Sequence, residues 1–120
     1  MLRVAKGAAW LHQEARLAEH LKAQGNRVTK LTESEAKGGD VLLNRSSRPV
    51  EFKTLRAARY ESFRNRLREA SKQARLAVVD VRGIHVTEQD VRGWVGRLPE
   101  HDRTRFDFLR VVGQDFDLTW

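Results

Sequence analysis

The chain has 120 residues, a formal net charge of +7, 40% hydrophobic and 32% charged residues, and no cysteine. A chain of this length forms one domain, predicted here over residues 1–120, and buries enough surface to fold without cross-links. The absence of cysteine excludes a disulfide scaffold, a cysteine zinc site and a cysteine nucleophile. No segment approaches the ~20 consecutive apolar residues of a membrane span, so no membrane span is expected.

The first half of the chain predicts one helix and three strands. An amphipathic pattern predicts a helix over 8–24, which Gly25 ends as a C-cap residue. Strands are predicted at 27–31, 40–44 and 50–55, and the last of them alternates apolar and polar residues.

The second half predicts a basic helix over 57–75 and then a strand over 76–82, whose continuous apolar run is typical of a strand buried on both faces. The capping-box pattern TEQD starts a helix over 87–98. Segments 106–112 and 116–120 predict a hairpin that covers one edge of the sheet. This order predicts an α/β class fold, an α+β sandwich in which the first two helices pack against a mixed sheet.

The excess positive charge lies in one central segment. Between Arg45 and Arg82 there are 11 basic and 4 acidic residues, whereas the rest of the chain is balanced. Such a segment favours a polyanionic partner, because neutralising phosphates releases counterions. Ordinary solubility charge is the alternative interpretation.

Glu14 interrupts the apolar stripe of the first predicted helix. At 100° per residue, five apolar side chains project within about 60° of it: Trp10, Leu11, Leu17, Ala18 and Leu21. A carboxylate on a buried face is costly without a cation, a metal or several donors. Glu14 is therefore a candidate functional residue, unless it lies at the rim of the stripe with its carboxylate in water.

A second acidic cluster lies around the predicted hairpin of strands 40–44 and 50–55. Glu51 and Lys53 are two residues apart on one strand and share a face, and Asp40 begins the preceding strand after two glycines. Two carboxylates beside an ammonium group make an oxygen site for Mg²⁺ or Mn²⁺, in which the lysine orients a water or stabilises phosphate charge. A surface Glu–Lys pair on an edge hairpin is the alternative.

The basic helix adds candidate phosphate contacts. Arg59, Arg66 and Gln73 are spaced seven residues apart and form one line beside the apolar stripe. Thr54 and Arg56 follow Lys53 closely and are further candidates for nucleic-acid binding.

The order of these features resembles the PD-(D/E)xK nuclease superfamily, with an αβββαβ core over residues 8–82. The segments EARLAEHLKAQGNRV, GGDVLLN, PVEFKTL and SKQARLAVVDVR are similar to the C-terminal nuclease domains of contact-dependent growth inhibition CdiA toxins. The resemblance implies an active site of Glu14, Asp40, Glu51 and Lys53, with Asp40, Glu51, the Phe52 carbonyl and Glu14 holding Mg²⁺ or Mn²⁺. Gly39 replaces the proline of the superfamily name.

The resemblance also implies the biological setting. It implies a toxin domain that cleaves tRNA, is secreted as the C-terminal part of a larger effector and acts in the target-cell cytoplasm. A cognate immunity protein, expected to be acidic, would be its partner. Two alternatives stay open: a DNA endonuclease with the same active site, and a non-catalytic module that binds nucleic acid through the basic segment alone.

Overall fold

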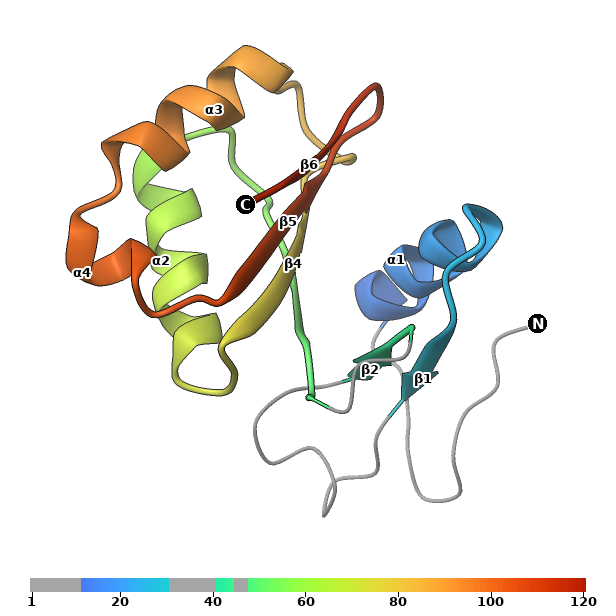
Figure 1. Cartoon of the computed structure of the whole chain (residues 1–120). Helices are drawn as coiled ribbons and strands as arrows, with labels where there is room; N and C mark the ends of the chain where they lie inside the picture. The colour runs from blue at the N-terminus through green and yellow to red at the C-terminus, as the bar shows by residue number, and fades with distance from the viewer. Residues whose placement is uncertain (1–11, 31–40, 45–47) are drawn as a thin grey trace.

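The computed structural model describes residues 12–30, 41–44 and 48–120 (Figure 1). Its elements follow the predicted order, with one short extra helix, α4. They are α1 (His12–Ala23), β1 (Val28–Lys30), β2 (Val41–Leu43), β3 (Glu51–Thr54), α2 (Tyr60–Ser71), β4 (Leu76–Asp80), α3 (Glu88–Arg97), α4 (Glu100–Arg103), β5 (Phe108–Val112) and β6 (Asp117–Thr119).

The main sheet has four strands in the order β3-β4-β5-β6. Strands β3, β4 and β5 are parallel, whereas β6 runs antiparallel to β5, so the predicted mixed sheet is confirmed. The predicted C-terminal hairpin covers the edge of β4. Strands β1 and β2 form a separate antiparallel pair, and a single bridge between Val41 and Val50 connects β2 to the start of β3.

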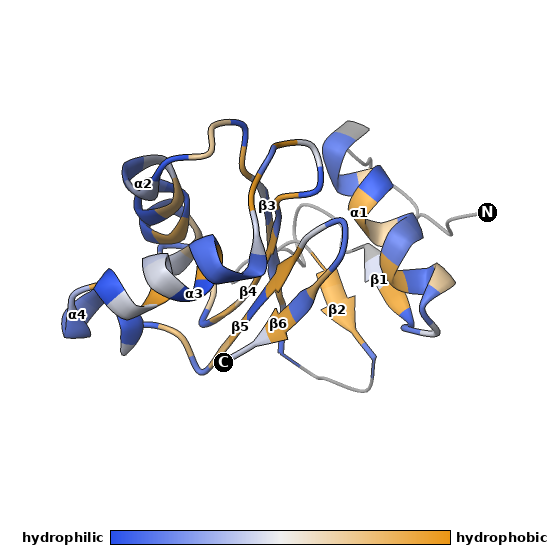
Figure 2. Ribbon diagram, turned by 90° about the horizontal axis from the view of Figure 1, so that it is seen from above, coloured by the Kyte–Doolittle hydropathy of each residue, from blue (hydrophilic) through white to orange (hydrophobic). Residues whose placement is uncertain are grey.

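The sheet separates two apolar cores. Figure 2 shows α1 on one side of the sheet and α2, α3 and α4 on the other. Strand β4 contributes to both cores: Leu76 and Val78 pack with α1, whereas Ala77 and Val79 pack with α2 and α3. All five of its residues are buried, as the continuous apolar run predicts.

Local capping signals set several helix ends. Gly25 has a φ of 94° after α1, as the C-cap prediction requires. The side chain of Thr87 accepts a hydrogen bond from the Asp90 amide, and the Asp90 carboxylate accepts one from the Thr87 amide, so the capping box is confirmed. Helix α2 is shorter than predicted, because Arg59 is its N-cap residue and the chain turns after Ser71.

Across the described part of the chain, helices are too short and too polar to cross a bilayer.

Candidate active site

A cavity of about 250 Å³ lies along β3, the edge strand of the main sheet. Side chains from the N-terminal half of α1, from β3 and its following loop, and from α2 form its walls. They belong to Gln13, Glu14, Glu51, Phe52, Lys53, Thr54, Arg56 and Arg66. Six of the sequence-predicted site residues therefore line one cavity: Glu14, Glu51, Lys53, Thr54, Arg56 and Arg66.

Strand β3 places Glu51 and Lys53 on the same face of the sheet. Their paired neighbours on β4 are Ala77 and Val79, which belong to the core beneath α2. The Nζ atom of Lys53 lies 3.3 Å from Oε2 of Glu51, and Glu51 is only 5% exposed. The Lys53 side chain is 22% exposed, so the pair is largely removed from water while its ammonium group still reaches the cavity. The predicted convergence of these two groups is confirmed.

Glu14 reaches the same cavity from the other side of the sheet. Leu17, Ala18 and Leu21 are fully buried in the core between α1 and the sheet, which confirms the apolar stripe and fixes the helix. Glu14 itself is half-buried and lines the cavity. Two carboxylates that come from opposite faces of the sheet thus face one small volume.

Asp40, the third predicted carboxylate, lies outside the described residues. The nearest described geometry is the bridge between Val41 and Val50, whose amides donate to each other's carbonyl oxygens at 3.0 and 2.6 Å. This bridge joins the residue that follows Asp40 in sequence to the residue that precedes Glu51.

The donor set of the cavity fits a hard divalent cation. Glu51 and Glu14 supply carboxylate oxygens, the ligand type that Mg²⁺ and Mn²⁺ prefer. Among residues 12–30, 41–44 and 48–120, no three His, Asp or Glu side chains converge as a metal-binding group. A carboxylate from outside these ranges, as predicted for Asp40, would complete such a group.

Two predicted nucleic-acid contacts lie away from this cavity. Arg59 is exposed at the start of α2 and is not among the lining residues. Gln73 lies in the turn after α2 and lines a different cavity, of about 350 Å³, together with Lys72 and Arg75. The line of residues 59, 66 and 73 assumed a longer helix, so only Arg66 contributes to the β3 cavity.

Glu69 is a site residue that the sequence interpretation missed. Its Oε2 atom lies 3.9 Å from Nζ of Lys53 and 3.1 Å from Nη1 of Arg66. The sequence does carry a signal for it, because positions 66 and 69 differ by 300° at 100° per residue and therefore lie about 60° apart on the helix surface. Lys53 is thus held between a buried carboxylate on β3 and a half-exposed one on α2.

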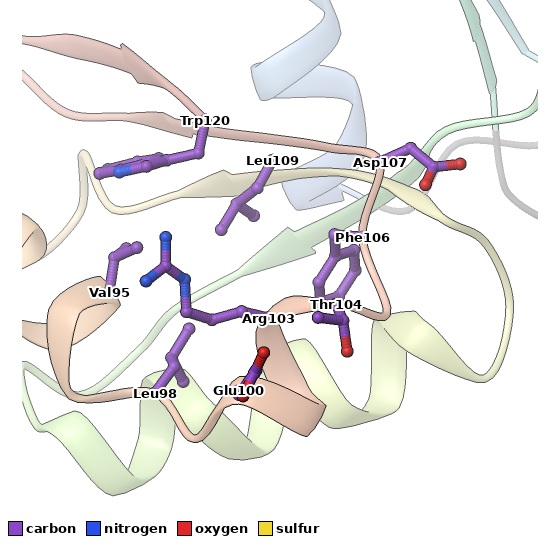
Figure 3. A pocket seen from close by; sticks show the side chains of 9 residues that line it. All are labelled: Val95, Leu98, Glu100, Arg103, Thr104, Phe106, Asp107, Leu109 and Trp120. Atoms are coloured by element: carbon purple, nitrogen blue, oxygen red, sulfur yellow. The ribbon is translucent and has the colours of Figure 1, made fainter.

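A second cavity, of about 600 Å³, lies elsewhere, between α3, α4 and the C-terminal strands (Figure 3). Its walls are mainly apolar, and Arg103 extends from α4 toward Val95 and Trp120. Asp107 points away from the centre in Figure 3 and accepts hydrogen bonds from Arg75 and Arg48, which hold its pKa at about 2. This cavity brings no lysine to a carboxylate pair, so the β3 cavity is the better candidate for chemistry.

No protein-family model, no curated protein and no solved structure matches the chain.

Proposed function

We propose that the chain is a metal-dependent endonuclease that hydrolyses phosphodiester bonds, with tRNA as its preferred substrate. The observation that carries the proposal is the buried Glu51 carboxylate with the Lys53 ammonium 3.3 Å away, in a cavity that Glu14 also lines. The same acids and amine are those implied by the resemblance to PD-(D/E)xK nucleases.

Glu51 and Glu14 would hold Mg²⁺ or Mn²⁺, with Asp40 and the Phe52 carbonyl as further proposed ligands. When bound, the ion would neutralise charge on the scissile phosphate and polarise its oxygens.

Lys53 is the residue best placed to act on the reacting groups. From its position beside Glu51, Nζ can donate one hydrogen bond to an attacking water and another to a phosphate oxygen. In the hydrolysis, the water gives up one proton to solvent and its oxygen bonds to phosphorus, the bond from phosphorus to the leaving sugar oxygen breaks, and that oxygen takes up a proton from solvent. Oε2 of Glu69 lies 3.9 Å from the ammonium group on the α2 side.

Arg56, Arg66 and Thr54 give the cavity its phosphate-holding capacity. Arginine presents a planar fork that matches phosphate oxygens, and the three residues line the same cavity as Glu51 and Lys53. They are therefore proposed to hold the diester on either side of the scissile bond.

The preference for tRNA and the biological setting rest on the resemblance to CdiA toxin domains. On that basis we place the chain at the C-terminal end of a larger secreted effector that acts in the target-cell cytoplasm. The net charge of +7 favours both a nucleic-acid substrate and an acidic immunity protein as partner.

Cleavage assays on two substrates test the proposal. Purified protein is incubated with total tRNA and with supercoiled plasmid DNA, each with Mg²⁺, with Mn²⁺ and with a chelator. We expect metal-dependent cleavage of tRNA, lost in Lys53→Ala and Asp40→Ala. Arg92→Gln is the control, since Arg92 is exposed on α3 and paired only with Glu88 among the contacts of the described residues.

Each alternative gives a different result in the same assays. Cleavage of plasmid alone would identify a DNA endonuclease, whereas RNA binding without any product would identify a non-catalytic module. Full activity of Lys53→Ala would refute the assignment of the site.

A further inference from the structure

The flank of α2 that faces α4 carries a second concentration of basic side chains, separate from the β3 cavity. We call it the α2–α4 basic surface, and its members are Arg48, Arg64, Arg68, Lys72, Arg75 and Arg105. Counting from Arg66 at 100° per residue, positions 64, 68 and 72 lie about 120–160° around the helix. The α2–α4 basic surface and Arg66, which lines the β3 cavity, therefore lie on different flanks of α2.

The cavity of about 350 Å³ at the C-terminal end of α2 belongs to this surface. Its lining includes three cations, Arg48, Lys72 and Arg75, together with the polar side chains of Ser71 and Gln73. None of its lining residues is acidic. A cavity with three positive charges and hydrogen-bond donors is chemically suited to a phosphate group.

Asp107 fixes the two guanidinium groups at this cavity. Arg75 donates from Nε and Nη2 to the Asp107 carboxylate at 3.1 and 3.0 Å, and from Nη2 to the Thr104 carbonyl at 3.0 Å. Arg48 donates to the same carboxylate. Two arginines therefore share one carboxylate at this cavity.

Asp102 also pairs with two arginines, nearer the N-terminus of α2. It is 3% exposed and accepts from Nε of Arg64 at 2.8 Å, and Arg68 lies 3.5 Å away. Arg105 extends the surface on the other side, where Nη1 lies 3.4 Å from Oγ of Ser71. Four of the six cations share two carboxylates: Arg64 and Arg68 pair with Asp102, and Arg48 and Arg75 pair with Asp107.

We propose that the α2–α4 basic surface binds the phosphodiester backbone of the nucleic-acid substrate at a distance from the cleaved bond. The inference rests on the proposed function for the identity of the polyanion. A helix with its side chains is about 10–12 Å across, so a strand held on both flanks of α2 would contact the protein at phosphates on each side of the helix. The surface would bind nucleic acid without sequence specificity, because it contacts phosphates and not base edges.

A binding experiment that needs no catalysis tests this surface. Binding of a fluorescein-labelled, 20-nucleotide single-stranded RNA is followed by anisotropy in chelator at several salt concentrations. The test variant is Lys72→Gln with Arg105→Gln, which leaves the Asp102 and Asp107 ion pairs intact. The matched control is Arg16→Gln with Arg92→Gln, two exposed arginines on α1 and α3, so both variants lower the net charge by the same amount.

We expect the test variant to bind RNA at least tenfold more weakly at low salt. Each lost phosphate contact reduces the slope of log K against log salt by about 0.7 for a single strand, so the slope should fall by about 1.4. The control should keep the wild-type slope. Equal losses in both variants, or none in either, would overturn the proposal.

Two further measurements distinguish this proposal from binding of an acidic polypeptide and from the proposed function. Poly-glutamate that binds as tightly as the RNA, with the same loss in the test variant, would assign the surface to an acidic polypeptide and would overturn phosphate recognition. In metal-containing assays the test variant should raise KM for tRNA and leave kcat unchanged. If the wild-type protein binds RNA and the test variant shows the predicted loss of slope, but the wild type never cleaves, the proposed function is refuted and the proposed binding surface is supported.

Discussion

Nζ of Lys53 lies 3.3 Å from Oε2 of Glu51 and 3.9 Å from Oε2 of Glu69, so one ammonium group bridges the edge strand and the helix that covers it. Glu51 is almost fully buried, and a buried carboxylate is tolerated only with a charge or donors close by. The ammonium therefore has a structural role in addition to the proposed chemical one, and substitutions must be designed to separate the two.

Lys53→Arg separates them, because it keeps the positive charge but replaces a compact ammonium with a planar guanidinium. We expect cleavage to fall at least 100-fold, while the melting temperature stays within a few degrees of wild type. Single-turnover cleavage and thermal unfolding measure the two effects. Cleavage at the wild-type rate in Lys53→Arg would show that the site needs only a charge at this position.

Divalent metal should stabilise the folded chain. Glu14 and Glu51 line one cavity, and an ion held by them would bind the folded chain but not the unfolded one. At a metal concentration ten times the Kd, the free energy of unfolding should rise by about 1.4 kcal/mol. Thermal unfolding with and without Mg²⁺ or Mn²⁺ checks this, and Glu51→Gln should lose the increase. A melting temperature that neither metal changes would contradict a metal site.

Asp102→Asn should weaken the attachment of α4 to α2. Burial by itself raises the pKa of Asp102, but the hydrogen bond from Arg64 and the charges of Arg68, Arg64 and His101 outweigh it and hold the pKa below its usual value. Removing the charge leaves those cations with a poorer acceptor. Because Arg64 and Arg68 are partly exposed and can regain water, we expect a loss of about 1–3 kcal/mol.

Urea unfolding at neutral pH measures this loss, with the exposed Asp115→Asn as the matched control. The difference between wild type and Asp102→Asn should shrink as the pH falls toward the lowered pKa of Asp102. A variant as stable as wild type at pH 7 would show that the two arginines do not depend on this carboxylate.

His20 should make the fold less stable in mild acid. Burial and, next, the positive charge of Arg82 lower its pKa below 6.5, and Arg110 adds to the decrease; the charges of Asp80 and Asp117 act in the opposite direction. The unfolded chain then binds the proton more readily than the folded chain. This contribution to stability is complete above about pH 6.5 and is lost as the pH falls below it.

Urea unfolding of wild type and His20→Gln between pH 7.5 and pH 5 isolates this contribution. The decline in the free energy of unfolding over this range should be smaller in the variant. Parallel curves for the two proteins would mean that His20 titrates alike in both states.

Thr87→Ala should remove one half of the capping box of α3. The Asp90 amide loses the acceptor it now has at 3.0 Å, and an N-cap substitution of this kind costs about 1 kcal/mol. Thr87→Ser keeps a hydroxyl and should restore most of that stability. If alanine and serine are equally stable in urea unfolding, the hydroxyl makes no net contribution.

The sequence by itself determined what depends on near neighbours. The alternation in β3 put Glu51 and Lys53 on one face, and the 3.6-residue period of α1 put Leu17 and Leu21 with Glu14 on one stripe. The order of the strands and long helices, the capping box and the buried character of β4 followed from the same local rules.

Only the tertiary structure decided which of these faces meet. Glu14 and Glu51 line one cavity because α1 and α2 cover opposite faces of the sheet and both reach its β3 edge, and Glu69 lies near Lys53 because α2 packs over β3. Gln73 lines another cavity because α2 ends at Ser71. These contacts depend on how whole helices and strands pack. The free energy of that packing is summed over residues far apart in the chain, so no local sequence pattern predicts it.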